Sequence, residues 1–438
     1  MTTVSPREQL IDLYGAAVAG ANVKSLTANA VASVPLERGH RVWIFALGKA
    51  AHTMADAAVT TVQRALADVA GGIVVAPEAG DSPSGTMHAI VGDHPVPGRR
   101  SFTAAARVGQ IIGLKRSGDL GIILLSGGAS SLIAAPLRGM SEADLSQLYE
   151  LLMGAGLDIH QMNAIRKRFS YWAAGRMALI LAPARTYCFA VSDVTGDDLA
   201  AIGSGPCVPD PTRVQHVIDL LQSVNLLGKI SPSFRQYLRD TVRGVIPETP
   251  KASHPAFAHV TARVISNNGT ALTAAASAAR RMGFVTSVRE QALVGDAAVA
   301  GEKVVDALLT AREKAERGST HCMIWGGETT VTFRGPAPRG GRCQELALAA
   351  SKFLADAGDR ATGISLLAAG TDGRDGVTDA AGAIVDAATW STIRAARDPA
   401  AALRNHESYD ALATANALFS PGLTGTNVMD VTIGLVRA

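Results

Sequence analysis

The chain has 438 residues, of which 47% are hydrophobic and 18% charged, a length that indicates two or three domains. A net charge of +3 is too small at this length to indicate a nucleic-acid partner. No apolar run reaches membrane-spanning length and no secretory leader precedes the first helix, so we expect a cytoplasmic protein without a membrane partner. The four cysteines are widely spaced and predict neither a zinc site nor a disulfide framework: Cys188, Cys207, Cys322 and Cys343.

The first half of the chain alternates strand and helix patterns. A capped helix is predicted to begin at Ser5. Buried strands are predicted at 41–47, 72–76, 89–91, 121–125 and 186–191, and helices at 51–58, 101–115, 141–154 and 162–177. This order predicts a doubly wound, mostly parallel sheet, in which ligands bind beyond the carboxyl ends of the strands.

A loop of small residues follows the strand at 121–125 and leads into a second apolar run at 132–135, where a helix could open. Paired glycines let backbone N–H groups approach a ligand closely, and hydroxyl groups add donors, so the loop is a candidate phosphate cradle. Its members are Ser126, Gly127, Gly128, Ala129, Ser130 and Ser131. An ordinary tight turn between strand and helix is the alternative.

Lys49 and His94 also follow predicted strands, so both are expected at the same edge of the sheet as the cradle. A lysine at a helix start opposes the helix dipole, which favours a role in binding an anion. The segment is not a Walker A loop, because Trp43 replaces the upstream glycine and Ala50 replaces the Ser or Thr that binds magnesium.

Asp193 ends the strand at 186–191 and is followed by Asp197 and Asp198. Carboxylate oxygens at a strand end are candidate ligands for a divalent cation. Simple turn chemistry is the alternative, above all for the second and third of these residues.

Residues 244–259 are polar and proline-rich, and we expect the main linker there, between domains at 1–245 and 258–438. The second half is predicted to form strands at 262–266, 283–288, 322–326, 329–333 and 365–369, with helices at 269–281, 296–317, 344–357 and 410–417.

Two charged residues stand out in this half. Glu328 is expected in a turn between two strands, and Arg342 at the start of a helix, where its planar fork suits a carboxylate or phosphate. The acidic loop 370–376 ends a buried strand, and a plain solvated loop is its alternative interpretation.

Taken together, these motifs resemble those of the class II glycerate kinases, whose C-terminal half is called the MOFRL domain. The matching stretches cover nearly the whole chain in order: 46–51, 92–97, 125–132, 163–170, 192–198, 203–206, 327–331, 340–342, 344–345, 369–373, 378–382 and 424–430.

The resemblance implies ATP-dependent phosphorylation of glycerate with Mg²⁺, and we expect D-glycerate to give 2-phosphoglycerate. It also implies two α/β domains around a cleft, the first Rossmann-like and the second a smaller MOFRL-type domain. The resemblance implies three catalytic residues, Lys49, Arg342 and Asp193, and Asp193 is also the expected metal ligand. The nucleotide is expected to contact Ser126–Ser131, Gly205 and Pro206. The substrate is expected to contact Lys49, His94, Arg342 and Glu328. A homo-oligomer is compatible with the sequence.

The chain departs from the family pattern at three places: Cys343 stands where Asn is usual, Ala173-Ala174-Gly175 replaces Lys-Gly-Gly, and Gly203 replaces Ala. Two other functions remain open at this point. One is hydroxypyruvate reduction, a name that members of this family have also carried, although no GxGxxG follows a predicted strand. The other is non-catalytic binding of a sugar acid or nucleotide.

Overall fold

A computed structural model describes residues 4–333 and 338–438. The chain folds into two compact units. The first unit is Val23–Ile265, and the second joins the N-terminal helix α1 (Pro6–Gly20) to Ser266–Ala438. No helix in the described part of the chain is long and apolar enough to cross a membrane.

The first unit is built on a six-stranded sheet with the order β3-β2-β1-β4-β5-β6. All four strand pairs from β3 to β5 are parallel, which confirms the predicted Rossmann-like sheet. The direction of the strand order reverses between β1 and β4, so their carboxyl ends form the switch point at which such sheets bind ligands. The strands are β1 (Arg41–Leu47), β2 (Asp68–Ala76), β3 (Met87–Val91), β4 (Leu120–Leu125), β5 (Thr186–Val191) and β6 (Val260–Ser266).

Both faces of this sheet are apolar because helices cover both. Trp43, Phe45 and Leu47 on β1 share a core with Ala104 and Val108 of helix α4. Side chains alternate along a strand, so the intervening residues of β1 face the other side, and α3 contacts β1 and β2. Five helices of this unit are α2 (Val23–Ala32), α3 (Ala51–Arg64), α4 (Arg99–Ile112), α5 (Ala129–Leu132) and α8 (Arg176–Leu181).

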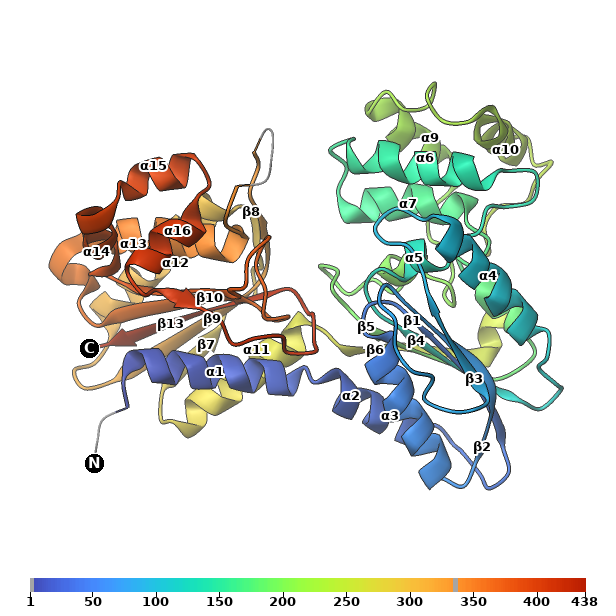
Figure 1. The fold of residues 1–438 in the computed structure, drawn as a ribbon, viewed down its shortest axis with the longest axis horizontal. Coiled ribbons are helices and arrows are strands. Elements are labelled where there is room, and N and C mark those ends of the chain that lie inside the picture. Colours follow the sequence, from blue (N-terminus) through green and yellow to red (C-terminus); the bar gives the residue numbers. More distant parts are fainter. Residues whose placement is uncertain (1–3, 334–337) are drawn as a thin grey trace. The chain divides into compact units, whose positions relative to one another are not determined.

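Four more helices gather at one end of the first unit around a core of their own (Figure 1). They are α6 (Glu142–Met153), α7 (Ile159–Phe169), α9 (Val214–Ser223) and α10 (Pro232–Val242). Phe169 stacks on Phe234 with ring centroids 4.4 Å apart. The single helix predicted over 162–177 is wrong: α7 ends at Phe169, and Ala174 and Gly175 take positive φ values of 55° and 79° before α8 begins.

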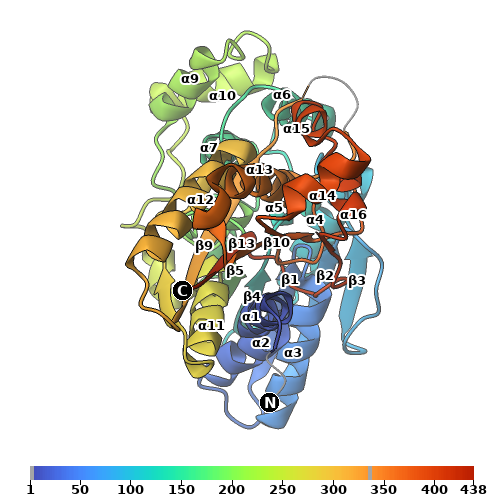
Figure 2. The ribbon, with the colours of Figure 1, turned by 90° about the vertical axis from the view of Figure 1, so that its left-hand side faces the viewer.

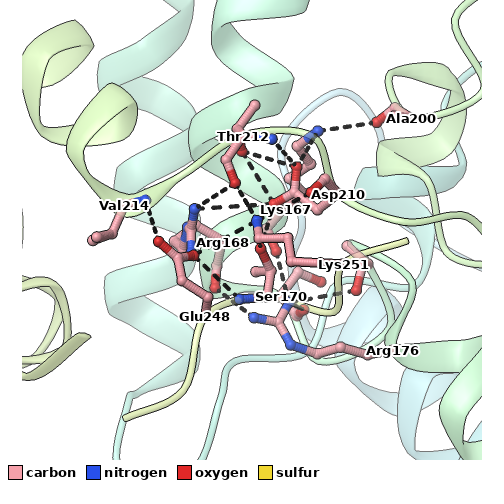
Figure 3. A network of polar contacts seen from close by, with 12 residues as sticks. Lys167, Arg168, Ser170, Arg176, Ala200, Asp210, Thr212, Val214, Glu248 and Lys251 are labelled. Atoms are coloured by element: carbon pink, nitrogen blue, oxygen red, sulfur yellow. Dashed lines mark hydrogen bonds and ion pairs between the residues drawn. The ribbon is translucent and has the colours of Figure 1, made fainter. Parts of the chain in front are cut away.

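The segment predicted as a linker belongs to the first unit. Thr249 donates a hydrogen bond to Asp210 (Oγ1 to Oδ2, 2.7 Å), and Glu248 pairs with the buried Arg168, in the polar network of Figure 3. Strand β6 then completes the first sheet, and the chain passes to the second unit after Ile265. The division therefore differs from the expected boundaries at 245 and 258, because these polar residues bind buried charges rather than solvent.

The second unit contains a mixed sheet with the order β12-β11-β10-β13-β9-β7, and β8 also pairs with β9. Strand β13 lies between β9 and β10 and is antiparallel to both (Figure 2). In contrast, β7 and β8 run parallel to β9. The strands are β7 (Val285–Val288), β8 (Leu293–Asp296), β9 (Thr320–Thr330), β10 (Ile364–Gly370), β11 (Gly382–Asp386), β12 (Leu418–Phe419) and β13 (Asp430–Arg437).

Helices cover both faces of this sheet: α1 and α11 lie on one side, and α12 and α13 on the other (Figure 1). Helix α1, which we expected in the first domain, buries Leu10, Leu13 and Ala17 here, and the Tyr14 hydroxyl donates to the Gly370 carbonyl at 2.7 Å. The helices are α11 (Asn268–Arg281), α12 (Ala297–Lys314), α13 (Arg342–Ala357), α14 (Thr389–Ala396), α15 (Pro399–Arg404) and α16 (Ser408–Thr414). Short 3₁₀ turns occur at Ile202–Ser204, Pro255–His259 and Gly358–Ala361.

The turn predicted around Glu328 is wrong, because β9 runs unbroken from Thr320 to Thr330. The two glycines of this strand, Gly326 and Gly327, allow neighbouring groups to approach its backbone closely. A Cβ on Gly327 would overlap the backbone of Leu293 in the neighbouring strand, and one on Gly326 would overlap the Asn268 side chain.

Candidate active site

Hydrogen bonds join the loop after β1 to the loop after β4 at the switch point of the first sheet. The Lys49 amide donates to the Gly127 carbonyl at 2.9 Å, and the Ala50 amide donates to Ser126 Oγ at 3.0 Å. The Ser126 amide in turn donates to the Leu47 carbonyl at 3.0 Å. These bonds fix the start of α3 against the cradle.

Because the paired glycines of the cradle lack a Cβ atom, three of the predicted site side chains can pack directly against the loop. A Cβ on Gly128, whose φ is +87°, would lie 2.8 Å from His94 Cδ2 and 3.7 Å from Lys49 Cγ. A Cβ on Gly127 would overlap the Asp193 carboxylate. Lys49, His94 and Asp193 therefore gather around the small-residue loop, at the edge of the sheet where the strand ends placed them.

The second half of the loop itself forms α5 (Ala129–Leu132), a single four-residue turn that ends where the sequence predicted a helix to open, at 132–135. A helix dipole consequently adds little, and the loop's own N–H groups and hydroxyls are the donors on offer. Ser130 Oγ lies 2.6 Å from Ser204 Oγ, and Ser131 Oγ donates to the Gly128 carbonyl at 3.1 Å. Since Ser126 Oγ accepts from Ala50, its hydroxyl hydrogen can still point to a ligand.

Gly205 and Pro206 are buried beneath α8. Their carbonyls accept from the amides of Gly175 (2.7 Å) and Ala178 (3.3 Å). These bonds tie the two residues to the start of α8, and their contact with a nucleotide stays a prediction.

Two shifted pKa values mark this site. Burial raises the pKa of Asp193, and the nearby Lys49 charge opposes that rise. Desolvation and the positive charges of Lys49 and Arg166 lower the pKa of His94 to about 4, so this imidazole is neutral at pH 7. A carboxyl with a raised pKa beside a lysine at the candidate cradle is a candidate acid–base group.

Asp193 also fits one part of a magnesium site. Among the described residues, no three His, Cys, Asp or Glu side chains converge as metal ligands. Mg²⁺ is commonly bound by one or two carboxylates together with substrate phosphates, so a single partly buried Asp193 beside a phosphate cradle suits that ion. Asp198 instead caps its own turn, with Oδ1 accepting from the Ala200 amide at 2.9 Å, as the turn interpretation predicted.

Helix α7 braces the loop that follows Asp193. Asn163 Nδ2 donates to the Ala201 carbonyl at 3.1 Å, and Lys167 Nζ donates to the Ala200 carbonyl at 3.4 Å (Figure 3). Arg166 on the same helix was not among the predicted site residues. It is 9% exposed, and its charge reaches His94. Its only signal in the sequence was a place inside the 163–170 motif.

Arg342, the first residue of α13, is the centre of a second charged cluster in the second unit. Its Nε and Nη2 bind both oxygens of Asp430 at 2.6 and 2.9 Å, and its Nη1 lies 2.8 Å from Glu328 Oε1. The structure thus joins the two predicted residues Arg342 and Glu328 directly. It also adds Asp430, which the sequence showed only as the end of the 424–430 motif.

Next to Arg342 lies a group of buried residues that includes the acidic side chain of Asp375. The Gln344 amide donates to Asp375 Oδ2 at 2.8 Å, so Asp375 caps α13 from a neighbouring loop, and a Cβ on Gly341 would overlap its carboxylate. Burial and the neighbouring Asp430 raise the pKa of Asp375 to about 7. Burial also raises the pKa of the Cys343 thiol, which stands where the family usually has Asn.

A parallel sheet whose switch point carries a lysine, a glycine-serine loop and a partly buried carboxyl group is typical of a ligand-binding α/β protein. Comparison with known proteins gives the family. Residues 9–239 match a domain of unknown function, DUF4147, and residues 321–430 match the MOFRL family.

A D-glycerate 2-kinase of Thermotoga maritima is 34% identical over 90% of this chain and 91% of its own length. A protein of Agrobacterium vitis, provisionally named a hydroxypyruvate reductase, is 36% identical over 98% of this chain and 94% of its own. The crystal structure of a glycerate kinase from Thermotoga maritima matches with a TM-score of 0.85 at 31% identity, covering 98% of this chain and 99% of that one. The chain belongs to the glycerate kinase family that joins DUF4147 to a MOFRL domain.

Proposed function

We propose that this protein is an ATP-dependent glycerate kinase that converts D-glycerate to 2-phosphoglycerate. The observation that carries the proposal is the meeting of Lys49, Asp193 and the 126–131 loop at the switch point, in a chain that belongs to this family. Lysine and backbone N–H groups suit the phosphates of ATP, and a carboxyl group suits the hydroxyl that receives the phosphoryl group.

In the proposed reaction, the 2-hydroxyl oxygen of glycerate forms a bond to the γ-phosphorus while the bond to the ADP oxygen breaks. The 126–131 loop holds the phosphates through its N–H groups and the Ser126 hydroxyl. Lys49 neutralises charge on the phosphoryl oxygens. Asp193 orients the substrate hydroxyl and accepts its proton.

His94 contacts the same loop as a neutral imidazole, so we assign it a hydrogen bond to substrate rather than a positive charge. Asp193 would hold Mg²⁺ together with ATP phosphate oxygens. When bound there, the ion would supply charge neutralisation at the transferring phosphoryl group.

Arg342 stays a candidate for binding the substrate carboxylate. Its contact to Glu328 is the exchangeable one, because the Glu328 side chain is 42% exposed whereas Asp430 is 10% exposed. A substrate carboxylate would take the place of the Glu328 carboxylate on the guanidinium, and Asp430 would keep the fork in position.

An ADP-release assay with D-glycerate, L-glycerate and other 2-hydroxy acids tests the proposal, and phosphorus NMR assigns the product. We expect Mg²⁺-dependent ADP release with D-glycerate and a phosphorus signal coupled to the C2 proton. Absence of ADP release with every acid would contradict the proposal.

Hydroxypyruvate reductase is the second candidate, because the Agrobacterium vitis relative carries that name. The loop after β1 reads Gly48-Lys49-Ala50-Ala51 and lacks the glycine fingerprint for a dinucleotide pyrophosphate. Loss of NADH absorbance on addition of hydroxypyruvate, without ADP release in the kinase assay, would favour this candidate.

A further inference from the structure

Three consecutive cations end helix α7, and all three are buried: Arg166, Lys167 and Arg168 are 9%, 3% and 0% exposed. Lys167 Nζ lies 2.8 Å from Asp210 Oδ1. Arg168 pairs with Glu248 and also faces Asp210 (Figure 3). Two of the three charges therefore have carboxylate partners inside the protein.

Arg166 is the exception. Within the described residues, no carboxylate lies at ion-pair distance from its guanidinium, and its buried Nε has no hydrogen-bond partner. Its neighbours are the Tyr149 ring, 4.5 Å below the guanidinium carbon, and the Met162 sulfur at 3.9 Å from Nη2. One aromatic face attracts a cation less strongly than burial of an unpaired charge disfavours it.

The unpaired charge lies next to the cradle. The Tyr149 hydroxyl, on the ring that Arg166 covers, donates to the Ser130 carbonyl at 3.2 Å. The positive charge of Arg166 acts on His94, which itself lies against Gly128. Arg166 thus lies among groups that contact the 126–131 loop, namely Tyr149 and His94.

We propose that Arg166 binds an oxyanion of the ligand held at the 126–131 loop, either a phosphoryl group or the substrate carboxylate. This inference rests on the proposed function and extends it. The protein supplies the cation, and the ligand supplies the carboxylate or phosphate partner that Lys167 and Arg168 find within the fold. The planar fork of arginine suits two oxygens of either group.

Calorimetric titrations of the full chain with ADP, with D-glycerate and with inorganic pyrophosphate test the proposal. Arg166→Gln removes the charge, and Arg239→Gln on α10 is the matched control, since Arg239 is exposed and its guanidinium donates to Gln236 on the same helix. Loss of a charged hydrogen bond predicts about tenfold or greater weakening of one ligand in Arg166→Gln and none in the control. Weakened ADP and pyrophosphate binding identifies a phosphoryl partner, and weakened D-glycerate binding alone identifies the carboxylate.

A folded Arg166→Gln variant that binds all three ligands like the wild type would overturn the proposal. If that variant does not fold, Arg166→Met also removes the charge and keeps a long unbranched side chain against Tyr149, and unchanged affinity for all three ligands in that variant would overturn the proposal equally. Failure of the wild type to bind ADP and D-glycerate would instead count against the proposed function, and pyrophosphate binding would still report on Arg166.

Discussion

Asp210 is the anion on which the buried network at the end of α7 depends, so Asp210→Asn should strongly destabilise the first unit. Its carboxylate accepts from Lys167 at 2.8 Å, from the Thr212 amide at 3.0 Å and from Thr249 at 2.7 Å, and its side chain is fully buried. The amide variant keeps the shape but removes the charge. Lys167 is then left buried without a counter-charge.

The expected loss of stability in Asp210→Asn can be derived in two independent ways. Lys167 and the hydrogen bonds lower the pKa of Asp210 from 3.8 to about 2 against the opposing effect of burial. A shift of that size is equivalent to about 2.4 kcal/mol of stabilisation by the charged form. Breaking a buried ion pair by removing one partner typically costs about 3–5 kcal/mol, a large part of the stability of a domain.

Urea denaturation at pH 7, followed by circular dichroism, measures the loss. Asp219→Asn is the control, because Asp219 is on the surface of α9 and accepts a hydrogen bond from Gln215 Nε2 at 2.8 Å on the same helix. Since the folded-state pKa is lowered, the stabilisation is present above the unfolded pKa near 4 and fades as pH falls toward 2. A loss below about 1 kcal/mol at pH 7, or a wild-type advantage that does not shrink in acid, would refute the reasoning.

Four further outcomes are expected. Lys49→Ala should lower kcat/KM by about 10²-fold or more while the circular dichroism spectrum stays native, and near-normal turnover would exclude Lys49 from catalysis. Gly127→Ala should displace the Asp193 carboxylate and reduce turnover more than it reduces thermal stability; equal losses in both would contradict a specific effect on Asp193. The His94 imidazole should titrate near pH 4 by NMR in the ligand-free protein, and a midpoint above 6 would be inconsistent with its surroundings. Asp375 has its pKa raised to about 7, so its contribution to stability is full below pH 4 and is lost as pH rises toward 7; Asp375→Asn should flatten that slope in denaturation curves, and an unchanged slope would contradict it.

The sequence predicted the first sheet well because its strands carry their signal locally. The apolar run 41–47 matches β1 residue for residue, and the run 186–191 matches β5. Parallel order then placed the residues after these strands at one edge, which is why Lys49, His94 and Asp193 were found together.

Features that depend on distant partners could not be predicted in this way. The local sequence Gly326-Gly327-Glu328 is compatible with a turn and also with a strand. The groups that require glycine here, Leu293 and Asn268, come from other elements. The 244–259 segment was predicted as a linker because it is polar and proline-rich. The partners that its polar residues bind, Asp210 and Arg168, are distant in the sequence, so no local pattern shows them. The missing partner of Arg166 could likewise be recognised only once the partners of its two neighbours were known.

The place of α1 has a consequence for how the protein is made. Its apolar face packs on α11 and β13, so the helix leaves the ribosome long before its binding surface has been synthesised. Leu10, Leu13 and Tyr14 must stay exposed or bind a chaperone while the whole first unit is translated and folds. Separate expression of residues 266–438 would leave the same surface bare, and we expect that fragment to aggregate unless a peptide carrying α1 is supplied with it.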